Sequence, residues 1–246
     1  MSEQRVALVT GGAVRVGAVI ARKLAAHGYR VAVHANRSLD RATALVAELA
    51  KSGCEAAAFG ADLRDEDAAR AMIDKAHRHF GRLNLLVNNA ATWSPTPLES
   101  TAADDVRRFF ETNTLSTFVC AQHAGLIMVE QPDGGAIVNV GDWATARPYR
   151  NYAAYFVSKG AIPTLTRALA VEFAPRVRVN AVLPGPVLLP DDVSTSARQR
   201  AIAGTLLARE GRPEHVAHAV HFLAENDFVT GVCLPVDGGR TIGETG

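Results

Sequence analysis

The stretch Thr10-Gly11-Gly12-Ala13-Val14-Arg15-Val16-Gly17 decides the fold, because it joins an apolar run to a helical pattern. The run Val6–Val9 before it is a predicted strand, and residues 16–27 after it carry apolar side chains at helical spacing. Glycines at a strand-to-helix turn let the backbone approach a pyrophosphate, whose charge faces the helix N-terminus. The position after the first strand favours this interpretation over an ordinary tight turn.

Six further β-rich runs alternate with long helical patterns. The predicted strands cover residues 31–34, 56–59, 83–87, 137–140, 177–182 and 232–236, and the predicted helices cover 40–51, 65–80, 104–130 and 151–174. Several strands are continuous apolar runs, as expected when both faces of a sheet are covered. We therefore predict an α/β chain with one domain over residues 1–246. Its fold would be a doubly wound Rossmann fold, a parallel seven-stranded sheet with helices on both faces.

The least regular part of the chain is residues 184–196, with three prolines and the adjacent acids Asp191 and Asp192. A long irregular segment beyond the carboxyl end of a strand is where substrates bind in such sheets. We expect a substrate loop, acting as a lid, over about residues 184–210.

Charge and composition exclude several classes of partner. The chain has 26 Lys and Arg against 25 Asp and Glu, without a basic cluster, so neither nucleic acid nor a membrane surface is an expected partner. No apolar run is long enough to span a membrane, and the N-terminus does not resemble a signal peptide. Cys54, Cys120 and Cys233 lie far apart, which favours reduced thiols and a cytoplasmic protein.

Three histidines recur at intervals of three residues, at His215, His218 and His221. They drift off a single helical face and have no cysteine nearby, so surface or satisfied histidines are favoured over metal ligands. No metal is expected.

The second predicted strand ends in His34-Ala35-Asn36-Arg37-Ser38. An NAD site places an acid here for the ribose hydroxyls, but this chain has none before Asp40. Arg37 and Ser38 offer a cation and a hydroxyl, which suit a 2′-phosphate, so NADPH is the predicted cofactor. An ordinary solvated arginine in a loop is the alternative.

Tyr155-x-x-x-Lys159 lies on the predicted helix 151–174, and the spacing of four puts both side chains on one face. A free tyrosine has a pKa of about 10, and a nearby ammonium lowers it towards neutral pH by stabilising the phenolate. The pair therefore predicts proton transfer by Tyr155.

Together these motifs resemble the short-chain dehydrogenase/reductase family over essentially the whole chain. The resemblance implies an adenine contact at Asp62-Leu63, a family Asn-Asn-Ala motif at Asn88-Asn89-Ala90, and an asparagine at Asn113 that supports a water-linked proton path to the lysine. It also implies a turn against the nicotinamide at Pro184-Gly185-Pro186-Val187.

The expected catalytic residues are Asn113, Asp142, Tyr155 and Lys159. The expected cofactor-binding residues are Gly11, Arg15, Val16, Gly17, His34, Asn36, Arg37, Ser38, Asp62, Leu63, Asn88, Ala90, Tyr155, Lys159, Pro184, Gly185 and Val187.

Two positions depart from the usual family pattern. Arg15 stands where the middle glycine of the turn is expected, and Asp142 stands where the family has a serine, thirteen residues before Tyr155. An ionised aspartate cannot donate a hydrogen bond to a substrate carbonyl, and its charge opposes formation of the tyrosinate. Asp142 therefore disfavours routine ketone reduction and suits a heterocycle whose ring nitrogen needs a proton. The alternative is that Asp142 only caps the following segment.

With Trp93, these departures resemble the pteridine reductase branch of the family. The resemblance implies substrate contacts from Arg15, Trp93, Asp142 and Tyr155, with the Trp93 ring stacked on a flat pterin. Packing of the loop 95–97 is the alternative role for Trp93. The expected function is NADPH-dependent reduction of a dihydropterin such as dihydromonapterin or dihydrobiopterin, with dihydrofolate as a further candidate substrate.

Two other functions remain open. One is a general carbonyl or 3-oxoacyl-thioester reductase, which Asp142 disfavours. The other is a non-catalytic NADP-binding regulator, which the retained Asn113, Tyr155 and Lys159 disfavour. The resemblance also implies a homotetramer, with helices 104–130 and 151–174 forming one interface.

Overall fold

A single parallel sheet of seven strands organises the computed structural model, which describes residues 4–189 and 193–243. The strand order is β3-β2-β1-β4-β5-β6-β7, so the chain reverses direction across the sheet between β1 and β4. The strands are β1 (Val6–Val9), β2 (Arg30–Ala35), β3 (Ala56–Gly60), β4 (Leu85–Asn88), β5 (Gly135–Val140), β6 (Val177–Pro184) and β7 (Cys233–Val236). The predicted fold class is confirmed.

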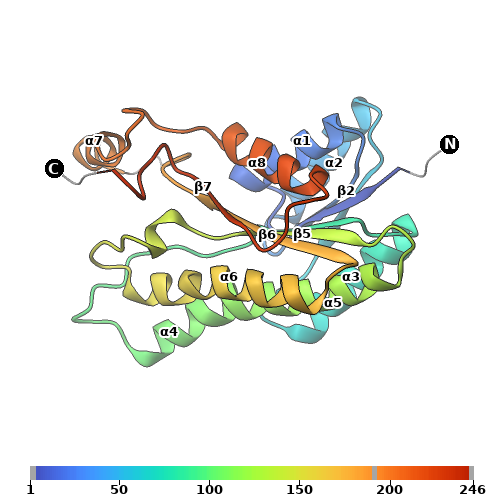
Figure 1. Ribbon diagram of the computed structural model, residues 1–246, viewed down its shortest axis with the longest axis horizontal. Helices are drawn as coiled ribbons and strands as arrows, with labels where there is room; N and C mark the ends of the chain where they lie inside the picture. The colour runs from blue at the N-terminus through green and yellow to red at the C-terminus, as the bar shows by residue number, and fades with distance from the viewer. Residues whose placement is uncertain (1–3, 190–192, 244–246) are drawn as a thin grey trace.

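Helices cover both faces of the sheet (Figure 1). One face carries α1 (Arg15–Ala26), α2 (Leu39–Lys51) and α8 (Pro213–Glu225). The other carries α3 (Glu66–Phe80), α4 (Ala103–Phe110), α5 (Ser116–Glu130) and α6 (Ala153–Glu172). The short helix α7 (Thr195–Ala203) lies apart from the sheet, in the loop between β6 and α8.

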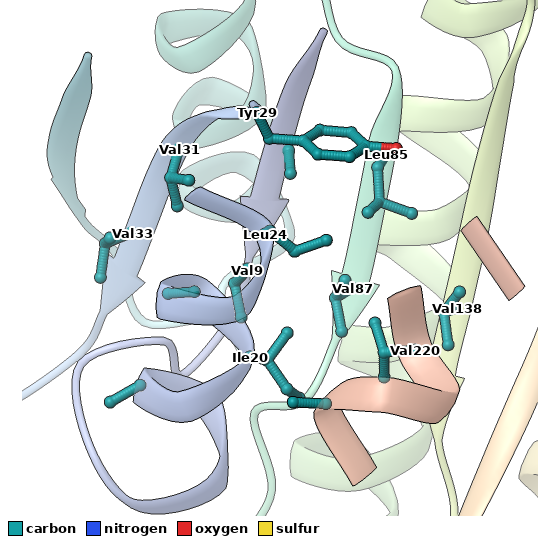
Figure 2. Packing of buried hydrophobic residues seen from close by; sticks show 14 of the residues in the cluster. Val9, Ile20, Leu24, Tyr29, Val31, Val33, Leu85, Val87, Val138 and Val220 are labelled. Carbon is teal, nitrogen blue, oxygen red and sulfur yellow. The ribbon is translucent and has the colours of Figure 1, made fainter. Parts of the chain in front are cut away.

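The core has two halves because successive residues of a strand point to opposite faces. In β1, Ala7 and Val9 pack with α1 and α8, whereas Val6 and Leu8 pack towards α3 and α5. Figure 2 shows the first half, where Ile20 of α1 and Val220 of α8 meet the strand valines. This double burial explains why the strands are apolar without alternation.

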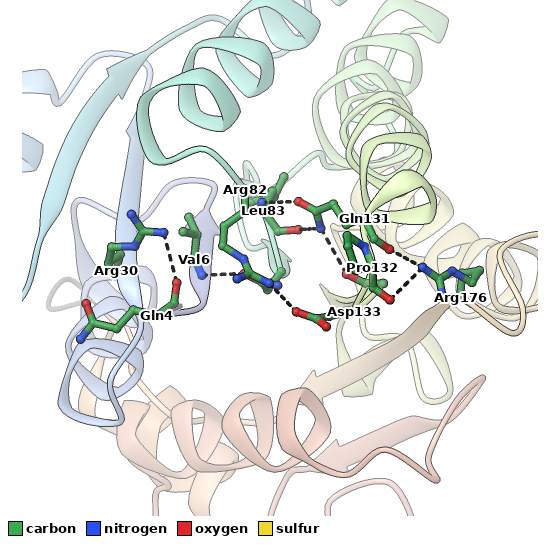
Figure 3. Close-up of polar contacts among 11 residues, drawn as sticks. Gln4, Val6, Arg30, Arg82, Leu83, Gln131, Pro132, Asp133 and Arg176 are labelled. Carbon is green, nitrogen blue, oxygen red and sulfur yellow. Dashed lines mark hydrogen bonds and ion pairs between the residues drawn. The ribbon is translucent and has the colours of Figure 1, made fainter. Parts of the chain in front are cut away.

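The amino ends of the strands are joined by polar contacts remote from the glycine turn (Figure 3). Gln131 accepts from the Leu83 N–H at 2.8 Å and donates to its carbonyl, and Arg82 pairs with Asp133 at 2.6 Å. These contacts satisfy the backbone just before β4 begins. The candidate site lies at the other end of the strands, beyond their carboxyl ends.

The predicted helix 104–130 is helical throughout, but it is not a regular α-helix over its whole length. The chain forms α4, then a π-helical turn over Glu111–Leu115, and then α5. The Ser116 and Thr117 hydroxyls donate to the carbonyls of Thr112 and Asn113, at 2.5 and 2.9 Å. These side-chain bonds occupy carbonyls in the turn where the ladder widens, a feature that hydrophobic spacing does not encode.

The predicted irregular segment is shorter than expected. Pro184 is the last residue of β6, and Ser194 caps α7 by accepting from the Ala197 N–H at 3.3 Å. Asp191 and Asp192 lie outside the described residues.

Candidate active site

The glycine turn after β1 has the close backbone packing that the sequence predicts. Gly11 has a φ of 59°, in the left-handed region that favours glycine. A Cβ on Gly17 would lie 2.2 Å from the Gly11 carbonyl oxygen, so only glycine fits there. Val14 gives α1 no side-chain cap, and the first turn of α1 has no acid. The helix N-terminus is therefore available to an anion such as a pyrophosphate.

The buried side chain of His34 holds this turn through a hydrogen bond. Its Nδ1 accepts from the Gly11 N–H and its Nε2 lies against the Ala61 carbonyl oxygen, both at 3.1 Å. Because Gly11 can only donate, the ring is neutral with its proton on Nε2. The side chain is 1% exposed, and burial lowers its pKa. Both ring nitrogens are thus occupied by the protein's own backbone, and His34 acts on the predicted cofactor site through the turn.

A cleft of about 640 Å³ opens along the carboxyl ends of β1, β2, β3 and β4. Eleven predicted cofactor residues line it: Gly11, Arg15, Val16, Gly17, His34, Asn36, Arg37, Ser38, Asp62, Leu63 and Ala90. The size of the cleft, the glycine turn beside it and the uncapped N-terminus of α1 all fit a dinucleotide. Asp62 is held by Arg64 at 2.5 Å, and this contact lowers the pKa of Asp62 to about 2.

Asn88, another predicted cofactor residue, does not line the cleft. It is buried and donates to the Asn139 side chain at 3.0 Å, joining β4 to β5. Its neighbour Asn89 lines the cleft instead and donates to the Thr10 and Gly11 carbonyls at 2.9 and 3.1 Å. The sequence reasoning missed Asn89 as a residue that holds the turn, although the doubled asparagine was a signal.

Eight further residues, none of them assigned to the site from the sequence, also line the cleft: Ala13, Val14, Ala35, Arg64, Ala91, Thr92, Arg108 and Thr112. Pro184 ends β6, Gly185 and Val187 follow it, and none of the three lines this cleft. Val187 lines a second hollow of about 400 Å³ with Gly211 and Gly239.

Asp142, Tyr155 and Lys159 are brought together at the end of β5 and the start of α6. Tyr155 donates a hydrogen bond to Asp142 Oδ2 at 2.6 Å, and Lys159 donates to the Val140 carbonyl oxygen at 2.7 Å. Asp142 Oδ1 accepts from the Ala144 N–H at 2.7 Å. The aspartate therefore caps the following turn, Trp143–Thr145, with one oxygen and binds the phenol with the other.

Burial changes the proton affinities of all three groups. It raises the pKa of Asp142, and it raises that of Tyr155 well above 10, with the Asp142 charge adding to the rise. Burial lowers the pKa of Lys159 to about 8, although the Asp142 charge acts against this fall. The phenol is therefore protonated at neutral pH. The predicted lowering of the Tyr155 pKa by Lys159 is wrong, because burial and the Asp142 charge dominate.

Asn113 lies in the π-helical turn and ties two loops together. Its side chain donates to Ser158 Oγ and the Thr92 carbonyl, both at 3.0 Å, and accepts from the Thr92 N–H at 2.8 Å. Ser158 precedes Lys159, so Asn113 links the loop after β4 to the catalytic helix. Its expected proton path to the lysine stays a prediction.

Of the two remaining predicted substrate residues, Arg15 lines the cleft and Trp93 does not. Arg15, in the left-handed region with a φ of 52°, donates to the Leu188 carbonyl at 2.7 Å and so joins the glycine turn to the loop after β6. Trp93 is 42% exposed and stacks on Tyr152, with ring centroids 4.8 Å apart and an interplanar angle of 17°. One face of the indole is therefore covered by the protein itself.

The histidines of α8 have local partners. His215 Nδ1 accepts from the Arg212 N–H at 3.0 Å, and the His221 ring lies 4.1 Å from that of His27. Within the described ranges, no three His, Cys, Asp or Glu residues group as metal ligands. Over the same ranges, no helix is long and apolar enough to cross a membrane.

Comparison with known proteins shows the family to which the chain belongs. The family model described as enoyl-(acyl carrier protein) reductase matches residues 12–241. Similar curated proteins include the putative ketoacyl reductase 2 of the granaticin polyketide synthase from Streptomyces violaceoruber, 37% identical and covering 96% of both chains. The human 3-oxoacyl-[acyl-carrier-protein] reductase is 35% identical and covers 96% of this chain and 97% of its own.

Solved structures agree with this placement. FolM alternative dihydrofolate reductase 1 from Brucella suis, in complex with NADP, aligns with a TM-score of 0.91 and 31% identity over 99% of this chain and 98% of its own. A blue fluorescent protein from a metagenomic library, in complex with NADPH, aligns with a TM-score of 0.89 and 36% identity over 96% and 97%. The chain therefore belongs to the short-chain dehydrogenase/reductase family.

Proposed function

We propose that this protein is an NADPH-dependent reductase of pterins. The observation that carries the proposal is the 2.6 Å hydrogen bond from the Tyr155 phenol to Asp142. A ketone reductase needs a hydroxyl donor beside the tyrosine, whereas a carboxylate only accepts hydrogen bonds unless it is protonated. An aspartate paired with a tyrosine suits a substrate that takes up a proton at a ring nitrogen.

The reaction divides between the cofactor and the side chains. Bound NADPH supplies a hydride to a ring carbon. Tyr155 and Asp142 hold a proton between them in a buried pair, and this proton goes to the adjacent ring nitrogen. Lys159, buried behind the pair, offsets the negative charge left on it. Asn113 positions the segment of α6 that carries the lysine.

The preference for NADPH rests on the end of β2. Arg37 and Ser38 line the cleft, and the segment from 34 to 39 holds no acid to repel a 2′-phosphate. The similar Brucella suis protein was crystallised with NADP, which supports the same choice.

Reduction of a 3-oxoacyl thioester is the second candidate. The granaticin and human relatives carry ketoacyl and oxoacyl reductase names, and this chain keeps the tyrosine, lysine and asparagine. A non-catalytic NADP-binding regulator is a third, which a buried, hydrogen-bonded Tyr155 disfavours.

A side-by-side assay tests these candidates. The protein and NADPH are offered dihydrobiopterin, dihydrofolate and acetoacetyl-coenzyme A in turn, and oxidation of NADPH is followed. We expect turnover of at least one pterin and its loss in Tyr155→Phe. Turnover of the thioester alone contradicts the pterin proposal, and turnover of none supports the regulator.

We also infer a homotetramer with α5 and α6 in one interface. Apolar side chains are exposed on both helices, among them Phe118, Leu126, Val157 and Val171. Light scattering on the purified protein tests this, and a monomer at micromolar concentration contradicts it.

A further inference from the structure

Arg147 and Arg240, which are far apart in the sequence, lie close together, and no carboxylate of the described residues pairs with either. Arg147 follows the turn Trp143–Thr145, and it donates through Nη1 to the Arg240 carbonyl at 3.2 Å and to the Gly243 carbonyl. Arg240 belongs to the segment after β7. In Figure 1 this segment runs towards α7, at the end of the molecule where the C-terminus lies.

The position of the Arg240 guanidinium is set by contacts with Trp143 and α7. It lies 5.1 Å from the centroid of the Trp143 ring, and its Nη1 donates to the Arg200 carbonyl of α7 at 3.2 Å. A Cβ on Gly204 would lie 1.2 Å from Nη1, so glycine at the end of α7 leaves room for the guanidinium. The Arg240 guanidinium is therefore held between Trp143, which follows Asp142, and the C-terminal part of α7.

Neither guanidinium forms an ion pair with any residue that the structure describes, whereas Arg5, Arg22 and Arg198 each do. Among the described residues of this tail, which end at Gly243, the acid is Asp237, and its carboxylate is already hydrogen-bonded. Its carboxylate accepts from the Gly239 N–H at 2.9 Å and from the N–H and hydroxyl of Thr241, both at 2.6 Å. Burial lowers the pKa of Arg240, and the charge of Arg147 lowers it further. An anion placed against the two cations would remove this repulsion.

The pair is connected to Asp142 through Trp143 and Tyr149. Trp143 directly follows Asp142, and Tyr149 interacts electrostatically with both Asp142 and Arg240. Tyr149 also packs edge-on against Tyr152, which stacks on Trp93. An aromatic wall therefore runs from the expected ring-binding position to the two cations.

We propose that Arg147 and Arg240 form a subsite for an anionic group on the substrate, remote from the reacting atoms. Two sources carry such a group: the carboxylates of a folate-type tail and the phosphates of a carrier thioester. The folate-type tail rests on the proposed pterin function, while the subsite itself does not. A planar guanidinium pair suits both, because it binds carboxylate or phosphate oxygens through paired N–H donors.

The test compares matched substrates that differ in charge. Dihydrofolate is paired with dihydrobiopterin, which has no acidic tail, and acetoacetyl-coenzyme A is paired with acetoacetyl-N-acetylcysteamine, which has no phosphate. For Arg240→Gln we expect KM for the charged member of a pair to rise roughly 10- to 100-fold relative to the neutral member. Arg240→Lys keeps the charge and should restore part of the loss. Arg150→Gln, at an exposed arginine in the loop that carries Arg147, is the control.

Each outcome separates the two proposals. A loss confined to dihydrofolate supports both, and a loss confined to acetoacetyl-coenzyme A with no pterin turnover keeps the subsite and contradicts the pterin function. Equal losses for charged and neutral members, or none, overturn the subsite. If Arg240→Gln does not fold, inhibition of the wild-type protein by N-(4-aminobenzoyl)glutamate and by its uncharged diester decides. Equal inhibition by the two overturns the proposal.

Discussion

The Tyr155 hydroxyl and Asp142 Oδ2 lie 2.6 Å apart, with the phenol as donor. Tyr155 is buried and Asp142 is partly buried, and both have a raised pKa. A serine in place of Asp142 would leave the phenol as an independent acid, whereas the carboxylate binds its proton. In the proposed function the pair acts as one acid–base unit, and its chemistry selects the substrate class.

Replacing Asp142 with serine should exchange one substrate class for the other. We expect kcat for the pterin to fall roughly 100-fold, in the range of a lost acid–base group, while reduction of an acetoacetyl thioester increases. Kinetics of Asp142→Ser with both substrates measure the exchange. Unchanged pterin kinetics would show that the carboxylate is not used.

The pH profile should reveal Lys159. Its pKa of about 8 means that the ammonium is present below pH 8 and is lost as the pH rises through that value. We expect kcat/KM for NADPH, which reports the free enzyme, to fall above about pH 8. Because the Asp142 charge raises the pKa of Lys159, Asp142→Asn should move this limb to lower pH. A limb that stays in place in the variant contradicts the coupling.

The sequence predicted the fold from features that are local or strictly periodic. The glycine turn at Gly11 and Gly17 and the seven apolar runs reflect close backbone packing and double burial, both of which act on residue type directly. The spacing of Tyr155 and Lys159 needs only a helix. These parts of the site were therefore predictable.

Other parts depend on contacts between distant segments. The two bonds of the His34 ring, the Arg15 contact with the Leu188 carbonyl and the seat of Arg240 against Gly204 join residues 23 to 173 positions apart. The π-helical turn at Asn113 interrupts a helix whose hydrophobic pattern continues. No local pattern encodes such contacts, so Arg15, His34 and Asn113 were assigned by resemblance, and Arg240 was not assigned at all.

Arg37 should control the choice of cofactor. Arg37→Ala removes the cation expected against the 2′-phosphate, so we expect KM for NADPH to rise roughly 10- to 100-fold and KM for NADH to change little. Arg41→Ala, an exposed arginine on α2, is the control for a simple loss of charge. Equal losses for both cofactors would sink the assignment.

His34 should contribute to stability above pH 6.5. His34→Leu leaves the Gly11 N–H and the Ala61 carbonyl without partners, at a cost of about 1–3 kcal/mol in the free energy of unfolding. Since burial lowers the pKa of native His34 below the ordinary value of 6.5, the unfolded chain takes up the proton first on acidification. The wild-type protein therefore loses stability below pH 6.5 by a route that the variant lacks.

Denaturant unfolding of both proteins at about pH 7.5 and about pH 5.5 tests this sign. The difference between them should shrink at the lower pH. His218→Leu, on an exposed side chain of α8, is the control. A difference that grows on acidification would show that protonated His34 is tolerated in the native turn.

Trp93 should bind the substrate ring and not the cofactor. One face of its indole is covered by Tyr152, and the side chain remains 42% exposed, so a flat heterocycle has access to it. Stacking of this kind contributes about 0.5–1.5 kcal/mol beyond buried area, so Trp93→Ala should raise KM for the pterin roughly tenfold. Trp93→Phe, which keeps a ring against Tyr152, should recover most of the loss. Phe228→Ala, at an exposed aromatic after α8, controls for general loss of surface, and titration of NADPH measures cofactor affinity. If Trp93→Ala weakens NADPH as much as the pterin, Trp93 supports the loop and does not contact the substrate.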